Sequence, residues 1–167
     1  AVSSGGTPSK YESLLDNIID DSMDNLLVTA RDAGRSYGGA EGPMIISDSP
    51  AFKDAIQNCL NDLKTKAPEY YNLINDNVLV ISSEITDMGG CSFGSGVFCL
   101  RAQDMSDRHW WALGVLVHEA THEKDRKAGM MYDSATKGKD LEVRAMTAQL
   151  AALKAVGAPQ KAITDAE

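Results

Sequence analysis

The stretch HWWALGVLVHEATHEKDRKAG, residues 109–129, decides the fold and raises the question of function. Its apolar residues have the spacing of a long helix, and Gly129 is typical of a residue that ends one. We expect Ser106 or Asp107 to cap the start of this helix. Within it, residues 118–122 spell H-E-A-T-H, so two histidines lie four positions apart.

The two histidines predict a metal site. Residues four apart on an α-helix lie about 40° from each other around the axis, so His118 and His122 project side by side. Glu119 projects next to them, close enough to hold a metal-bound water. Zinc suits imidazole nitrogen, and a catalytic zinc site usually has three protein ligands and one open position. A third ligand must therefore come from elsewhere in the chain.

Glu142 is the predicted third ligand. It follows His122 with nineteen residues between them, in a further helix that we expect to begin at Asp140 and to be closed by Gly157 and Pro159. One face of that helix combines this carboxylate with other side chains at helical spacing, namely Met146, Gln149 and Leu153. A carboxylate on an inward face is costly unless it is paired or binds a metal. Zinc would supply the compensating charge.

The motif with its downstream glutamate resembles the gluzincins, the thermolysin-like branch of the zinc metallopeptidases. The nineteen-residue interval is the one familiar from thermolysin, and the resemblance covers about residues 107–157. It implies that zinc is bound by His118, His122 and Glu142, with Glu119 as the general base. Thermolysin-like enzymes also use a tyrosine in the intervening segment to stabilise the oxyanion, which makes Tyr132 a candidate catalytic residue.

The chain departs from that family in several positions. The charged residues Glu123 and Lys124 follow the second histidine, so we expect this helix to become solvent-facing early. Met146 stands where thermolysin-like enzymes have an aspartate that supports a ligand, and no histidine lies downstream of His122. The resemblance therefore implies a minimal, single-domain member with a truncated scaffold.

The remaining sequence predicts an α+β fold, a mostly helical zincin-like domain with a small sheet next to the helix that carries the motif. We expect one domain over residues 1–167, with residues 1–8 flexible. Helices are expected at 10–33 and about 50–67, with a short helical turn at 69–76. Strands are expected at 44–46, 77–83 and 96–102, and a loop at 129–139. We expect the strand at 96–102 to be the sheet edge that pairs with substrate, with a purely structural strand as the alternative.

Composition limits the function classes. The 167 residues are 43% hydrophobic and 24% charged, as in ordinary soluble domains. A formal net charge of −8 argues against nucleic acid or an anionic membrane surface as the main partner. No apolar run approaches the ~20 residues that a membrane span needs. We expect a monomer that acts on a peptide or protein substrate.

The three cysteines favour one disulfide. Cys91 and Cys99 bracket CSFGSGVFC, whose Gly-Ser-Gly centre predicts a turn that brings them within bonding range. Reduced core cysteines are the alternative. Cys59 lies on the apolar side of its predicted helix, as a buried free thiol would. The opening AVSSGGTPS is small and polar and begins without Met, so we expect a mature secreted chain, with an artificial terminus as the alternative.

Polar and aromatic residues beside the motif have two possible roles each. His109 is expected on the opposite face from His118, in a capping or core role. Trp110 and Trp111 are expected to anchor the core, with substrate contact as the alternative. Gln149 would either form a hydrogen bond within the site or be a satisfied buried amide.

The charged residues near the motif are expected on the surface. Glu123 and Asp125 would pair there with Arg126 or Lys127. Arg144 is expected to point away from Glu142, with stabilisation of the transition state as its alternative role.

These observations predict a zinc-dependent metallopeptidase, specifically an endopeptidase, in which Glu119 activates a zinc-bound water. One alternative is a non-catalytic binding domain that keeps zinc for stability, but a structural site has no use for Glu119 and needs a fourth ligand. The other alternative is a zinc hydrolase of a non-peptide substrate, which the motif does not distinguish.

Overall fold

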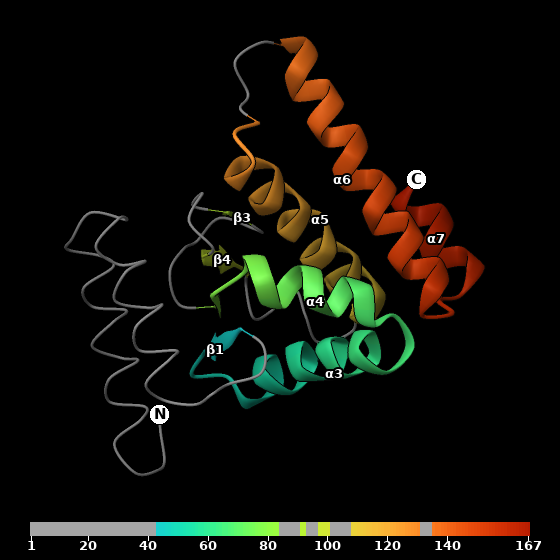
Figure 1. The fold of residues 1–167 in the computed structure, drawn as a ribbon. Coiled ribbons are helices and arrows are strands. Elements are labelled where there is room, and N and C mark those ends of the chain that lie inside the picture. Colours follow the sequence, from blue (N-terminus) through green and yellow to red (C-terminus); the bar gives the residue numbers. More distant parts are fainter. Residues whose placement is uncertain (1–42, 84–90, 93–96, 101–107, 131–134) are drawn as a thin grey trace, which may run out of the picture.

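The computed structural model describes residues 43–83, 91–92, 97–100, 108–130 and 135–167. The predicted helix at 10–33, the two capping candidates Ser106 and Asp107, and Tyr132 lie outside these ranges. Figure 1 shows the elements, which in chain order are β1 (Met44–Ile46), α3 (Pro50–Lys66), α4 (Pro68–Asn77), β2 (Val80–Ser82), β3 (Cys91–Ser92), β4 (Val97–Cys99), α5 (His109–Lys127), α6 (Ala135–Ala155) and α7 (Gln160–Ala166). The described part is mostly helical with a small sheet, which confirms the α+β prediction at this coarse level.

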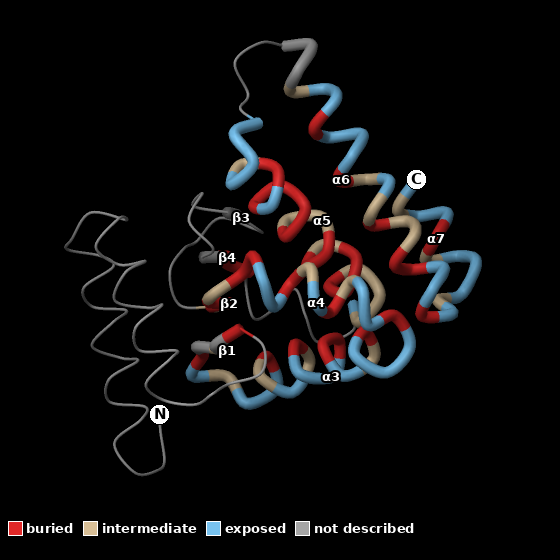
Figure 2. Tube along the Cα trace, in the orientation of Figure 1, coloured by how far each residue is buried: buried red, intermediate tan, exposed pale blue. Residues whose placement is uncertain are grey.

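Helix α5 is the centre of the core, because it packs against α3, α4, α6 and α7. Much of α5 is buried, as Figure 2 shows along the tube, and its buried apolar residues include Ala112, Leu113, Leu116, Val117 and Ala120. Gly129 ends the helix as predicted. Its φ of 84° is left-handed, its N–H donates to the Arg126 carbonyl, and the Met130 N–H donates to the Asp125 carbonyl. This pair of bonds is the Schellman arrangement that satisfies carbonyls at a helix end.

Helix α3 confirms its predicted start and its predicted inward face. The Ser49 hydroxyl accepts a hydrogen bond from the Phe52 N–H at 3.2 Å, and Pro50 occupies the first turn, where a missing N–H costs nothing. The apolar residues at helical spacing are buried, namely Phe52, Ile56, Cys59, Leu60 and Leu63. Pro68 ends α3 and opens α4, which has 10 residues and is longer than the predicted turn.

The sheet has the strand order β1-β2-β4-β3, with β1, β2 and β4 parallel and β3 antiparallel to β4. Because β4 pairs on both sides, the prediction that this strand is an exposed edge is wrong, and β3 lies at that edge instead. The register places Cys91 opposite Cys99. The side chain of Cys91 is outside the described part, so the disulfide stays a prediction.

Helix α6 begins at Ala135 rather than at the predicted Asp140, so the predicted loop at 129–139 is wrong in its second half. The helix includes Gly138, a residue that costs about 1 kcal/mol relative to alanine inside a helix but does not forbid one. Its predicted end is confirmed, since Gly157 has a φ of 74°. Among the described residues, no helix is long and apolar enough to cross a lipid bilayer.

Candidate metal centre

Helices α5 and α6 bring His118, His122 and Glu142 together. The two histidine Nε2 atoms lie 3.1 Å apart. Glu142 Oε2 is 3.3 Å from His118 Nε2, and Glu142 Oε1 is 3.1 Å from His122 Nε2. These three residues can each offer one ligand atom within 4.8 Å of the others, so the predicted grouping is confirmed and the group could hold a metal ion.

The spacing of the two imidazole nitrogens is compatible with one bound metal ion. Two ligands about 2.05 Å from a tetrahedral ion would be about 3.3 Å apart, and the two Nε2 atoms are 3.1 Å apart, whereas Glu142 approaches each histidine with a different oxygen. Two imidazole nitrogens that face each other at 3.1 Å need a proton or a cation between them, because their lone pairs otherwise repel. Two neutral imidazoles and one carboxylate are also a donor set that zinc takes in catalytic sites.

Burial divides this group into an inner and an outer part. His122 is buried, and the side chain of His118 is mostly so, whereas the side chain of Glu142 is 53% exposed. Burial lowers the pKa of His122, and the neighbouring His118 lowers it further, while Glu142 and Asp125 act in the opposite direction. The net effect favours the neutral imidazole, which is the form that binds a metal.

Glu119 lies on α5 between the two histidines, as the motif requires. Burial raises its pKa to about 7, and the negative charges of Glu142 and Glu123 add to the rise, against the opposing effect of Arg126. Among the described residues, its carboxyl group forms no hydrogen bond or ion pair that would hold it in another role. A carboxyl group that titrates near neutrality is suited to proton transfer.

Gln149, on α6, contacts the metal group through its side chain. Its Oε1 accepts a hydrogen bond from His118 Nδ1 at 3.0 Å. Of its two predicted roles, the structure supports the hydrogen bond within the site.

The prediction that Glu123 and Asp125 are surface charges is wrong. Asp125 is only 2% exposed, and its two oxygens accept hydrogen bonds from Arg144 Nε at 3.0 Å and Nη2 at 2.8 Å. Glu123 is also buried and accepts from Arg126 Nη1 at 2.6 Å. The prediction that the helix faces solvent after the motif is wrong at Glu123 and Asp125, which arginines pair with, and is confirmed at Lys124, which is exposed. The predicted pairing of Glu123 with Arg126 is also confirmed. The Asp125 hydrogen bond raises the pKa of Arg144 and occupies its guanidinium.

His109 and the tryptophans lie away from the metal group. His109 Nε2 is 2.7 Å from Asp62 Oδ2, and its Nδ1 is 3.6 Å from Cys59 Sγ, which confirms a structural role at the start of α5. Trp110 and Trp111 pack against the core as predicted.

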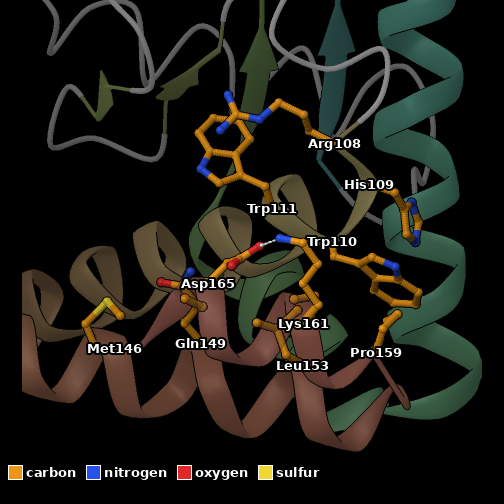
Figure 3. Close-up of a pocket in the computed structure, with 12 residues that line it drawn as sticks. Arg108, His109, Trp110, Trp111, Met146, Gln149, Leu153, Pro159, Lys161 and Asp165 are labelled. Atoms are coloured by element: carbon orange, nitrogen blue, oxygen red, sulfur yellow. Dashed lines mark hydrogen bonds and ion pairs between the residues drawn. The ribbon is translucent and has the colours of Figure 1, made fainter.

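A pocket of about 690 Å³ lies between the start of α5, the end of α6 and α7 (Figure 3). Trp110, Trp111 and Leu153 are among the apolar residues that line it, and the Lys161–Asp165 ion pair of α7 lies at its margin. Gln149 also lines it, so the pocket and the metal group share one side chain. Sequence reasoning missed this pocket, because it depends on how α7 folds back beside α5 and α6.

Comparison of the chain with protein-family models, with curated proteins and with solved structures gave no match. The resemblance to gluzincins therefore depends on the residues of the motif and their spacing in the sequence.

Proposed function

We propose that the protein is a zinc-dependent peptidase, specifically an endopeptidase of gluzincin type. The observation that carries this proposal is the convergence of His118, His122 and Glu142 at separations of 3.1 to 3.3 Å, with Glu119 on the same helix as the histidines. Zinc held by these residues would act as a Lewis acid toward the scissile carbonyl and would lower the pKa of water.

The roles of the side chains follow from their surroundings. Glu119 would accept a proton from the attacking water and deliver it to the nitrogen of the leaving amine. In the metal-free protein, burial raises its pKa to about 7, and a bound cation would favour the carboxylate, which is the form that accepts the proton from water. Tyr132, which lies outside the described residues, stays a prediction as the donor to the oxyanion.

Two features favour catalysis over zinc bound for stability alone. Among the described residues, no fourth histidine, cysteine or carboxylate joins the group of three, whereas structural zinc sites are closed by four ligands. Glu142 is half exposed, so the group is accessible from the α6 side. Secretion and an extracellular peptide substrate remain part of the proposal.

The first experiment is zinc analysis by mass spectrometry on the wild-type protein, Glu142→Ala and Asp140→Ala. Asp140 is an exposed carboxylate on the same helix, two residues from Glu142, and serves as the matched control. We expect about one zinc per chain in the wild type and in Asp140→Ala, and a loss in Glu142→Ala. The zinc-loaded protein should then cleave peptides in a mixed library, and the metal-free protein should not.

Wild-type protein that binds no zinc after reconstitution would refute the metal centre. Zinc that is bound without cleavage of any peptide in the library would refute the peptidase and leave the two alternatives, a zinc-stabilised binding domain or a hydrolase of another substrate.

A further inference from the structure

Gln149 occupies an unusual position for an amide side chain. It is 8% exposed, and it reaches from α6 across the helix interface to the Nδ1 atom of His118 at 3.0 Å. The bond fixes a direction, because a carbonyl oxygen can only accept. Nδ1 must therefore be the donor, and the neutral ring keeps its lone pair on Nε2. That atom is the one that faces His122 and Glu142.

Gly114 lies against the Gln149 side chain. It lies four residues before His118 on α5, and a Cβ atom added there would be 3.0 Å from Gln149 Nε2 and 3.1 Å from Gln149 Cγ. Contacts that short require the Gln149 side chain to give way by a few tenths of an ångström. A glycine within a helix costs about 1 kcal/mol relative to alanine. At this position the missing Cβ leaves space that the Gln149 side chain fills.

We propose that Gln149 is a positioning residue of the metal centre, which selects the Nδ1–H tautomer of His118, and that Gly114 is the residue that admits it. The inference deepens the proposed function and rests on it for the identity of the metal. Partners of this kind orient the ring of a metal-bound histidine, and their loss typically weakens metal affinity by about 10- to 100-fold.

The neighbouring residue on this face of α6 has no comparable group. The Met146 side chain has no oxygen that could accept a hydrogen bond from His118. Gln149 lies a further turn along α6 on the same face, and the geometry assigns the supporting oxygen to this residue.

The test has two readouts on four variants. Gln149→Leu removes the acceptor, Gln149→Glu keeps one, Gly114→Ala displaces the side chain, and Gln57→Leu is the matched control, because Gln57 forms an exposed amide hydrogen bond on α3 away from the centre. The first readout is the tautomer of His118 in the zinc-free protein, from the nitrogen chemical shifts of its ring at a pH where the ring is neutral. The second is zinc affinity by competition with a chelator.

We expect the wild type, Gln149→Glu and Gln57→Leu to hold the Nδ1–H tautomer. Gln149→Leu and Gly114→Ala should lose that preference and bind zinc about 10- to 100-fold more weakly. A purely structural role would lower the melting temperature without changing the tautomer. Gln149→Leu with the wild-type tautomer and zinc affinity would overturn the inference, and so would loss of both in Gln149→Glu.

The two proposals fail separately. If the wild type binds no zinc, the proposed function fails, while the tautomer of His118 in the zinc-free protein still decides the role of Gln149. If Gln149→Leu does not fold, Gly114→Ala is compared with Gln149→Glu. The first keeps the amide but shifts it, and the second keeps an acceptor oxygen in place.

Discussion

Two neighbouring parts of the α5–α6 interface differ in how their charged residues are used. Toward the end of α5, buried Asp125 meets Arg144 in a bidentate pair, so the charges are balanced by protein alone. One turn earlier, His118, His122 and Glu142 converge as possible metal ligands, with the Glu119 carboxyl nearby. A buried carboxylate that accepts two hydrogen bonds from an arginine has a structural role, whereas a convergence of histidine and carboxylate ligand atoms indicates a binding site. The two parts therefore predict different responses to substitution.

The largest expected effect is on catalysis at the metal group. Glu119→Gln should keep one zinc per chain and lower kcat by about 10²- to 10⁴-fold, because it removes the group that transfers protons and no ligand atom. Peptide cleavage by the zinc-loaded variant, with zinc measured on the same sample, checks this prediction. Undiminished kcat in Glu119→Gln would remove Glu119 as the base.

At the Asp125–Arg144 pair, Arg144→Met should destabilise the fold by about 3 to 5 kcal/mol, because Asp125 would be left as a buried charge without its partner. The matched control is Lys161→Met, which breaks the exposed ion pair with Asp165 and should cost less than about 1 kcal/mol. Urea unfolding of both variants measures the difference. Equal costs would show that the Asp125–Arg144 pair behaves as a surface pair despite the burial of its aspartate.

The zinc-free protein offers a test that is independent of catalysis. The folded pKa of Glu119, about 7, is raised above the ordinary 4.5, so the native state favours the protonated form. The contribution to stability is present below pH 4.5 and is lost as the pH rises through 7. Glu119→Gln, which stays neutral, should therefore be more stable than the wild type at pH 8. The gain is at most about 3.5 kcal/mol by the free energy of such a pKa change.

That gain should shrink as the pH is lowered toward 5, where both side chains are uncharged in the folded state. Unfolding of the two zinc-free proteins at several pH values checks it. A difference that does not change between pH 5 and 8 would mean that the Glu119 carboxyl keeps its ordinary pKa in the fold.

The sequence predicted the metal group well, because its ligands depend on local periodicity. The i, i+4 spacing fixes His118 beside His122. The prediction that Glu142 lies on an inward face is wrong, because its side chain is 53% exposed and lies at the margin of the buried surface of α6. The Ser49 cap and the glycine ends of α5 and α6 are local signals of the same kind. The predicted strand 44–46 is found unchanged as β1.

The failures share a different cause, since each depends on how distant elements pack. Asp125 finds its counter-charge nineteen residues away on α6, whereas spacing along α5 indicated only the cations close by in the chain. The place of β4 inside the sheet depends on the pairing of β2 and β3 with it, which strand propensity does not encode. The predicted loop at 129–139 ends instead at Ala135, because tertiary packing can keep Gly138 in a helix.

The smallest expected effect concerns Cys59. Unlike the metal group and the Asp125–Arg144 pair, this buried side chain carries no charge. Burial raises the pKa of its thiol to about 12, and the charge of Asp62 adds to the rise. Since the thiolate is the reactive form, the folded protein at pH 8 should not be alkylated at Cys59 by N-ethylmaleimide, whereas the urea-unfolded protein should be. Peptide mapping by mass spectrometry separates this thiol from Cys91 and Cys99. The raised pKa also means that its contribution to stability is present below pH 9 and is lost as the pH rises through about 12, so Cys59→Ala should flatten part of the alkaline decline. Rapid labelling of Cys59 in the folded protein would show that the space between α3 and the start of α5 opens to solvent.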